Sequence, residues 1–363
     1  MKNLLKNGLL LATIGLTVFT SCRRDGDENV PTSETKIDHL LIQEVYYGGT
    51  YYTRTDKGKE NTIPYKEDKY IKICNPTSKT VYLDNYALAV HFFDPTYRIE
   101  LRDEFNFMKT HFGVSTIVLF GGNGTQHALN AGASVVIAQE AIDHRLKKEK
   151  ELKEDAEEDF DSYKGLDRFL DLSKADFQWA TKDEDDNIIN KGNIMKPLYS
   201  EGEWENIEEM RDFDVKSSSV IALIKLDDTP ENIKKTFQEE AKYEKAEDMT
   251  KRKYYKNIAY KTGGHHGKQS SLLTIPYKWV EDVVTICPDR DFKWSLVTLQ
   301  IDKGHKGVQE TGNEKIEKHA GKALARKFDG KKYVDDNNTT SDFEVVNASL
   351  SPKKKEQVAA SEK

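Results

Sequence analysis

KYIKICNPTSKTVYLDNYALAVH, residues 69–91, decides the fold class of this chain. The runs on either side of its turn are rich in β-branched and aromatic residues and partly alternate, which predicts β-strands over 69–74 and 80–91. Between them, Asn75-Pro76-Thr77-Ser78 predicts a tight turn, because proline fixes one dihedral and short polar side chains bond neighbouring backbone groups. We therefore expect a mainly antiparallel β architecture.

Further strand signals occur along the chain. They cover residues 39–47 (HLLIQEVYY), 133–138, 218–226, 278–286, 323–326 and 342–346. Two stretches dense in Lys and Glu, Leu146–Asp161 and Glu231–Tyr254, separate these signals. Charge pairs three and four residues apart stabilise helices, so these stretches predict solvated helices or helical loops.

The first 22 residues resemble an export signal. Lys2 and Lys6 give a positive start, an apolar run follows, and Phe19-Thr20-Ser21-Cys22 ends in small residues and a cysteine. The run is shorter than the roughly 20 residues of a membrane-spanning helix. Small residues ending at cysteine resemble the bacterial lipobox, with Phe19 in place of its usual Leu. We therefore expect a lipoprotein signal peptide over 1–21 and lipidation of Cys22, with a plain secreted signal as the alternative.

The expected lipid determines the predicted location. Residues 22–36 are polar apart from Val30, which is typical of a flexible tether. A chain anchored through Cys22 has the membrane as a partner. We expect it in the outer membrane, facing the cell surface.

Composition limits the possible partners. The chain has 363 residues, of which 37% are hydrophobic and 10% aromatic, as in a folded protein. Removal of residues 1–21 takes away two lysines and no acid, which lowers the net charge from −7 to −9. An acidic chain argues against a nucleic-acid partner, whose phosphates require clustered cations. Cys74 and Cys287 lie in strand-like sequence, where buried free thiols are commoner than disulfides, although a pairing stays open.

The order of these signals resembles the lamin-tail type of immunoglobulin-like sandwich. Its opening I-x-E-V strand corresponds to Ile42–Val45, its N-P-T strand end to Tyr70–Thr77, and its L-x-x-[WY]-x-L pattern to Leu83–Leu88. Its closing Leu-x-Arg strand, polar turn and Asp-Phe pair correspond to Ala323–Arg326 and Asp335–Phe343. The resemblance implies a mainly β fold, an Ig-like (lamin-tail-like) antiparallel β-sandwich with helical or irregular insertions.

The match is discontinuous, which sets the predicted domain organisation. We expect one sandwich domain over 37–346, with insertions at about 141–216 and 227–274. Residues 347–363, rich in Lys and Ala, are expected to form a disordered tail.

With its lipobox, the chain is similar to an uncharacterised class of Bacteroidota surface lipoproteins, often associated with outer-membrane uptake receptors. The resemblance implies a binding module, accessory to a nutrient uptake receptor, with a TonB-dependent receptor as partner. Two alternatives stay open: a surface adhesion or assembly protein without a small-molecule ligand, and an envelope hydrolase with a site built from distant residues. The sequence has no Gly-x-Ser-x-Gly, His-Glu-x-x-His or phosphate-loop motif, so we do not expect an enzyme.

Two segments are candidate ligand sites. Tyr46, Tyr47, Tyr51 and Tyr52 flank two glycines and predict an aromatic loop after the first strand, with packing on the sandwich edge as the alternative. His265 and His266, in a glycine-rich segment, are weaker candidates for a metal or haem, because adjacent residues rarely point at one ion. The acidic run 183–187 lacks the order of a calcium loop. No particular cofactor is predicted.

Overall fold

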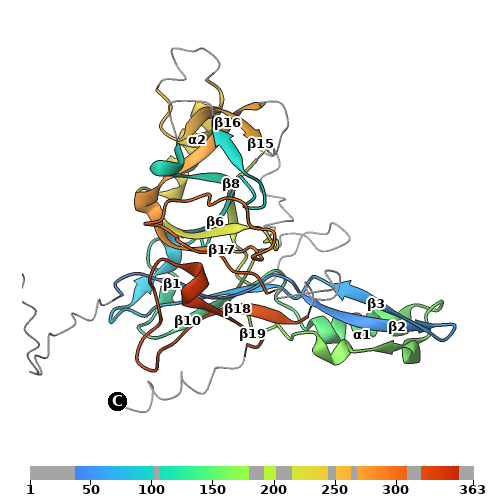
Figure 1. Ribbon diagram of the computed structural model, residues 1–363. Coiled ribbons are helices and arrows are strands. Elements are labelled where there is room, and N and C mark those ends of the chain that lie inside the picture. Colours follow the sequence, from blue (N-terminus) through green and yellow to red (C-terminus); the bar gives the residue numbers. More distant parts are fainter. Residues whose placement is uncertain are drawn as a thin grey trace, which may run out of the picture. The chain divides into compact units, whose positions relative to one another are not determined.

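The structure, a computed structural model, describes residues 37–101, 107–179, 192–201, 215–243, 251–262, 268–308 and 320–350. The expected signal peptide, Cys22 and most of the tether lie outside these residues. From Ile37 onward the chain forms one unit, organised around two large sheets and two small ones (Figure 1). No helix among the described residues is both long enough and apolar enough to cross a bilayer.

The first large sheet has six strands in the order β12-β10-β4-β1-β18-β19. Its central strand β1 (Leu41–Tyr46) is antiparallel to both neighbours, β4 (Tyr70–Cys74) and β18 (Lys322–Arg326). The outer strands are β10 (Ser134–Ala138), β12 (Phe177–Gln178) and β19 (Phe343–Asn347). Because β18 and β19 come from the end of the chain, β1 completes its pairing only when the late sequence is present.

The second large sheet has the order β17-β14-β6-β8-β16-β15-β7, and β13 also pairs with β8. Its strands are β6 (Tyr86–His91), β7 (Ile99–Leu101), β8 (His111–Leu119), β13 (Lys196–Ser200), β14 (Val220–Lys225), β15 (Tyr255–Thr262), β16 (Lys268–Pro276) and β17 (Val280–Thr285). Every pair in it is antiparallel. The prediction of a mainly β, antiparallel fold is therefore confirmed.

The two sheets pack face to face around one apolar core, which makes the sandwich. Alternate residues of the six-stranded sheet meet alternate residues of β6, β14 and β17 in the second sheet. The core includes Ile42, Val45, Ile71, Ile73, Ile137 and Leu324 on one side and Leu88, Ile221, Leu223 and Val284 on the other.

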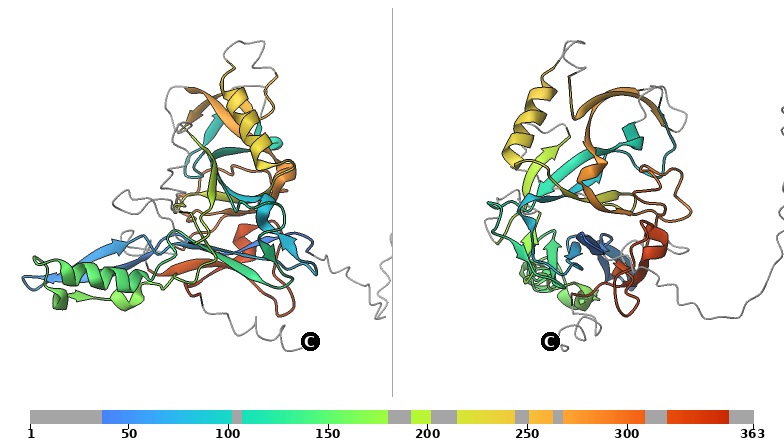
Figure 2. Two further views of the ribbon diagram at one scale, coloured as in Figure 1. Left: turned by 180° about the vertical axis from the view of Figure 1, so that it is seen from behind. Right: turned by 90° about the vertical axis from the view of Figure 1, so that its left-hand side faces the viewer.

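A second core covers the opposite face of the eight-stranded sheet. There Ala87, Ala89 and Ala222 contribute small side chains, and Phe112, Leu273 and Trp279 contribute large ones. The sheet curves from β6 to β15, with helix α2 (Pro230–Ala241) against it (Figure 2). Burial on both faces explains why β14 is an unbroken apolar run, VIALI, rather than an alternating one.

Helix α2 is placed by its caps and by one buried acid. Thr229 caps its start by accepting a hydrogen bond from Asn232 N, and Pro230 occupies the first turn. Ile233, Phe237 and Glu240 form its buried stripe. The Glu240 carboxylate accepts three backbone N–H groups at 2.6–3.0 Å, from residues 253, 254 and 255. This acid therefore fixes the chain that leads into β15.

The turn predicted at residues 75–78 is confirmed in its chemistry. Asn75 Oδ1 accepts hydrogen bonds from Thr77 N and Thr77 Oγ1, and Asn75 Nδ2 donates to the carbonyls of Lys79 and Leu129. One asparagine thus satisfies backbone groups on two chain segments.

The predicted strand over 80–91 is interrupted. β5 (Val81–Tyr82) pairs with β9 (Ala128–Leu129), and the 3₁₀ turn η1 (Leu83–Asn85) separates β5 from β6. The reason is Asp84, whose carboxylate accepts N–H groups of Gly124, Gln126 and His127 at 2.9–3.0 Å. Burial acts to raise the pKa of Asp84, but these donors lower it below its usual value.

An ion cluster joins the two layers of the sandwich. The Arg326 side chain is 1% exposed and contacts Asp282 of β17 at 2.5 Å, Asp335 at 3.4 Å and Asp342 at 3.7 Å. Its Nε donates to Ile42 O, and Asp282 accepts Ile42 N at 2.7 Å. The closing motif expected to be a polar turn therefore also holds β1, β17 and β18 together.

His39 extends this cluster to the start of the fold. Its Nε2 lies 3.2 Å from Asp335 Oδ2. This hydrogen bond raises the pKa of His39 to about 9, against the lowering effect of burial. The histidine is therefore a cation at neutral pH, placed just before β1.

Other expectations differ in detail from the structure. Helix α2 ends at Ala241, whereas the charged stretch was expected to be helical as far as Tyr254, which is buried next to β15. In the second large sheet, strands β7, β8, β13, β15 and β16 were not predicted. Cys74 and Cys287 are buried free thiols rather than a disulfide, which is the commoner of the two outcomes considered from the sequence. The shorter elements are η2 (Phe107–Lys109), η6 (Tyr277–Trp279) and α5 (Thr339–Asp342).

Candidate functional site

A hairpin continues outward from the β1–β4 pair. β1 leads into β2 (Thr50–Asp56), and β3 (Lys59–Tyr65) leads back into β4 (Figure 1). Lys57 and Gly58 form the two-residue turn, with φ of 48° and 76°, a conformation typical of tight hairpins. We call β2, β3 and the segment 144–169 packed on them the arm.

The strand ladder is interrupted where the arm begins. Residues 47–49 and 66–69 separate the inner strand pair from the outer one, and we call residues 46–49 and 65–70 the arm root. Gly49 has a φ of +68°, and a Cβ placed there would lie 2.1 Å from the Tyr65 carbonyl oxygen. The close approach of two chain segments therefore requires glycine here.

The arm has a small core of its own. Helix α1 (His144–Glu154) is capped by Asp143, whose side chain accepts a hydrogen bond from Leu146 N at 3.0 Å. After it, the short strand β11 (Tyr163–Lys164) pairs with β2. The 3₁₀ turns η3 (Phe160–Ser162) and η4 (Leu166–Arg168) lie on either side of β11 in the chain. The buried residues are Tyr52, Tyr65, Leu152, Leu166 and Phe169. Rings of Tyr65 and Phe169 stack with centroids 4.1 Å apart. Part of the first predicted insertion (about 141–216) thus packs on the β2–β3 hairpin.

Cations lie over aromatic rings on the outer surface of the arm. The Arg168 guanidinium is 4.4 Å from the Tyr51 ring centroid, and Lys153 Nζ is 4.5 Å from that of Phe160. Arg168 is exposed, and Tyr51 is half-buried. Such pairs contribute roughly 0.5–1 kcal/mol at exposed sites and hold a charged group in a defined place.

A third pair includes an acid. Arg54 lies over Tyr163 at 5.6 Å and forms an ion pair with Glu158 at 2.8 Å, and the Tyr163 hydroxyl donates to the same carboxylate at 2.6 Å. This hydrogen bond and burial, the larger cause, raise the pKa of Tyr163 to about 12. The arm surface therefore combines ordered rings with ordered charges of both signs.

The arm root contains a buried polar cluster. Tyr46 and Tyr70 pair across β1 and β4, with ring centroids 5.4 Å apart. The Tyr70 hydroxyl donates to Glu44 at 2.6 Å and accepts Ser349 N, and the Tyr46 hydroxyl donates to Asp68 at 3.5 Å. Glu44 is 3% exposed and Asp68 is 0% exposed. Two carboxyl groups and two phenols thus share one desolvated site.

Asp68 is an acid of this cluster with a strongly raised pKa. Its Oδ2 accepts Leu170 N at 3.3 Å, while Oδ1 is buried without a hydrogen-bond partner. Burial raises the pKa of Asp68 to about 7, and the neighbouring Glu67 adds to the rise. The backbone N–H groups of Leu170 and of Asp68 itself and the Tyr46 hydroxyl oppose it. The group therefore changes charge near neutral pH.

His144 is a second buried titratable group beside the root. Its Nδ1 lies 2.8 Å from the Tyr65 hydroxyl and its Nε2 3.2 Å from Glu140 O, which fits a neutral ring that accepts at Nδ1 and donates at Nε2. Burial lowers the pKa of His144 to about 4. Its contacts fasten α1 to the hairpin.

The predicted aromatic residues lie at the root and in the arm rather than in one loop. Tyr46 ends β1, the Tyr47 hydroxyl accepts Val308 N at 2.9 Å, and Tyr52 packs in the arm core. These three rings are at most 8% exposed, because each packs in a different apolar cluster. Tyr51, on the other face of β2, is the accessible member. His265, His266 and the acidic run 183–187 lie outside the described residues.

Sequence reasoning did not identify Asp68, Tyr163 or Arg168. Asp68 lies in a polar run that looks like a solvated turn, and Arg168 contacts Tyr51 across 117 positions. No local pattern marks such pairs. Among the described residues, no group of three or more His, Cys, Asp and Glu side chains is arranged to hold a metal ion.

A family model described as a protein of unknown function (DUF4876) matches residues 130–349, more than half of the sequence. The chain belongs to this family. The crystal structure of a DUF4876 family protein from Bacteroides thetaiotaomicron VPI-5482 is similar, with a TM-score of 0.58 and 20% identity, over 86% of this chain and 72% of that one. At this identity the likeness concerns the fold. No curated protein matches the sequence.

Proposed function

We propose that this DUF4876 protein is a lipid-anchored binding protein of the bacterial outer membrane that engages another protein through its arm. The lipobox-like segment ending at Cys22 supports the anchor, and a family member in Bacteroides supports a bacterial envelope with an outer membrane. The role is binding rather than catalysis.

The observation that carries the binding role is the surface of the arm. The three cation–aromatic pairs described above lie on a projection that has a small apolar core of its own. Tyr and Arg are enriched in protein interfaces: the Tyr ring brings a large contact area at a low cost in conformational entropy, and the Arg guanidinium brings a planar set of hydrogen-bond donors. In the Tyr51–Arg168 pair the cation is exposed, lies 4.4 Å from the ring centroid and also donates to Tyr51 O at 3.4 Å.

The partner in this proposal is an outer-membrane uptake receptor of the TonB-dependent type, for which the lipoprotein would be a nutrient-binding accessory. An accessory needs to remain near the receptor, and a lipid at Cys22 confines it to the same membrane. A projecting arm then offers a contact surface away from the sandwich body.

Co-purification from native membranes tests the arm. A tagged full-length protein carrying Tyr51→Ala and Arg168→Ala should recover roughly 10–100 times less receptor than the parent, equivalent to about 1–3 kcal/mol. Lys225→Ala is the matched control, because Lys225 lies 5.5 Å above the Tyr86 ring on the sandwich. Equal recovery by the arm variant, or an equal loss in the control, would contradict the proposal.

Lipid labelling tests the anchor separately. Cys22→Ser should abolish incorporation of a labelled fatty acid and move the protein from the membrane to the soluble fraction, since it removes the acylated thiol and keeps the apolar run. Continued labelling with unchanged membrane association would exclude Cys22 as the lipid site.

A further inference from the structure

The arm root has the construction of a joint. The inner and outer strand pairs share no continuous ladder across residues 47–49 and 66–69. Gly49 is the point where the two passes approach, and its carbonyl accepts Gly321 N at 3.2 Å. Side-chain hydrogen bonds of a buried cluster therefore add to backbone contacts at the root such as Gln139 N to Lys69 O, 2.8 Å.

Asp68 connects the separate segments that meet there. It lies on the pass from β3 to β4, its Oδ2 accepts the Tyr46 hydroxyl of β1, and the same oxygen accepts Leu170 N from the segment that leaves the arm. It is fully buried, and its Oδ1 has no hydrogen-bond partner. One carboxyl group thus links three segments of the chain: β1, the β3–β4 connection and the segment after the arm.

We propose that Asp68 is a proton-operated lock at the arm root: the protonated carboxyl holds the arm in one orientation, and loss of the proton admits water and frees the arm to move. A neutral carboxyl tolerates burial, whereas a carboxylate with an unpartnered oxygen requires solvation. Water can reach Oδ1 only if the packed segments separate.

The surroundings of Asp68 favour the neutral form. Glu44 lies beyond Tyr70 on the adjoining strands, and Glu67 precedes Asp68 in the chain. Lys66 and Lys69, on the same pass, are exposed and half-exposed, and Lys72 of β4 pairs in register with Glu44. On the adjoining arm segment, His144 is neutral at this pH, because burial lowers its pKa to about 4, and Asp171 is exposed. The change of charge at Asp68 falls near pH 7.

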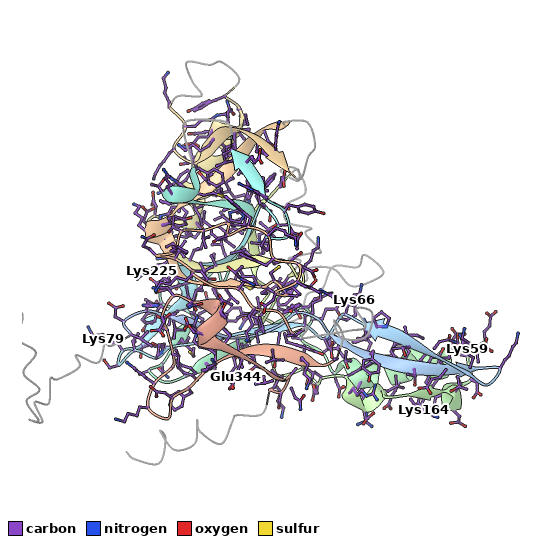
Figure 3. All side chains as sticks on the ribbon, in the orientation of Figure 1. Lys59, Lys66, Lys79, Lys164, Lys225 and Glu344 are labelled. Atoms are coloured by element: carbon purple, nitrogen blue, oxygen red, sulfur yellow. The ribbon has the colours of Figure 1, made fainter. Side chains whose placement is uncertain are left out.

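Spin-label distances in the full chain test the lock. Labels on Lys59→Cys, near the arm tip, and Lys79→Cys, on the sandwich, are well separated and solvent-facing (Figure 3). With Cys22→Ser, the native cysteines that remain are Cys74 and Cys287, both buried. The distance distribution should be narrow at pH 5.5, broad at pH 8.5, and change with a midpoint near pH 7.

Three substitutions separate the lock from other causes. Asp68→Asn should keep the narrow distribution at every pH, because an amide does not ionise. Tyr46→Phe should raise the midpoint, because the Tyr46 hydroxyl favours the ionised carboxyl. Asp171→Asn, an exposed aspartate of the adjoining segment, is the control and should behave like the parent.

A distribution that does not change with pH in the parent, or a change that persists in Asp68→Asn, would overturn the proposal. Should Asp68→Asn fail to fold, a ¹³C titration of the Asp68 carboxyl in the parent decides, because its midpoint must coincide with that of the distance change. These measurements need no partner, so they fail or succeed independently of the binding role proposed above.

Discussion

Removal of the Arg326 side chain should cost more stability than any surface substitution of the same type. In Arg326→Met, Asp282 loses its 2.5 Å partner and stays buried, and Ile42 O loses a donor. Removing one partner of a buried ion pair costs about 3–5 kcal/mol, because the other charge is left without compensation. Methionine fills a similar volume, so little of this loss comes from a cavity.

The expected change in melting temperature follows from the size of the fold. An unfolding entropy of about 2.1 cal/mol/K per residue gives roughly 0.6–0.7 kcal/mol/K for a body of some 300 residues. A loss of 3–5 kcal/mol therefore lowers Tm by roughly 5–8 °C. Differential scanning calorimetry of the Cys22→Ser protein with and without Arg326→Met measures this directly.

Two further variants identify the cause. Arg145→Met removes an arginine with a 2.8 Å partner, Glu149, at an exposed position of α1, and should leave Tm nearly unchanged. Adding Asp282→Asn to Arg326→Met should restore part of the loss, because the amide oxygen still accepts Ile42 N while the buried charge is gone. A Tm change below 2 °C in Arg326→Met would refute the assignment of this cluster to the stability of the sandwich.

Two other predictions concern the arm root and the start of the fold. Gly49→Ala should destabilise the protein far more than Gly58→Ala in urea unfolding: both glycines have positive φ, but a Cβ meets the Tyr65 carbonyl at 2.1 Å in the first and nothing within 4 Å in the second. Similar urea midpoints would contradict this. The pKa of His39, about 9 when folded, lies above its ordinary 6.5, so its stabilising contact with Asp335 is complete below pH 6.5 and lost as pH rises to 9. The urea midpoint of the parent should fall between pH 7 and pH 10, and this fall should be smaller in His39→Ala. If the variant shows the same fall as the parent, groups other than His39 cause the pH dependence.

The sequence predicts the strands of the sandwich because their cause is local. Ile71 and Ile73 alternate with polar positions in β4, and Asn75 provides the side chain that its turn needs. The apolar run of β14 is equally visible. What covers its second face is not visible, because that cover comes from other elements before and after β14, through residues such as Phe112, Phe237 and Leu273.

The arm and its root were not predictable for a different reason. Tyr51 and Tyr52 look alike in sequence, and only the register of β2 turns Tyr52 inward and leaves Tyr51 accessible. Asp68 has polar neighbours that are typical of a surface turn. Its burial results from Tyr46 and Leu170, which fold over it from distant parts of the chain.

The position of β1 has a mechanical consequence. Toward the N-terminus it leads to the segment that would carry the lipid, and toward the C-terminus it passes through Gly48 and Gly49 directly into β2. Tension between a membrane anchor and a partner held on β2 would therefore run along about ten residues of covalent chain, in series. The sheets and their ion cluster would lie beside this line of force, so a pull on the arm would reach the membrane without first unfolding the sandwich.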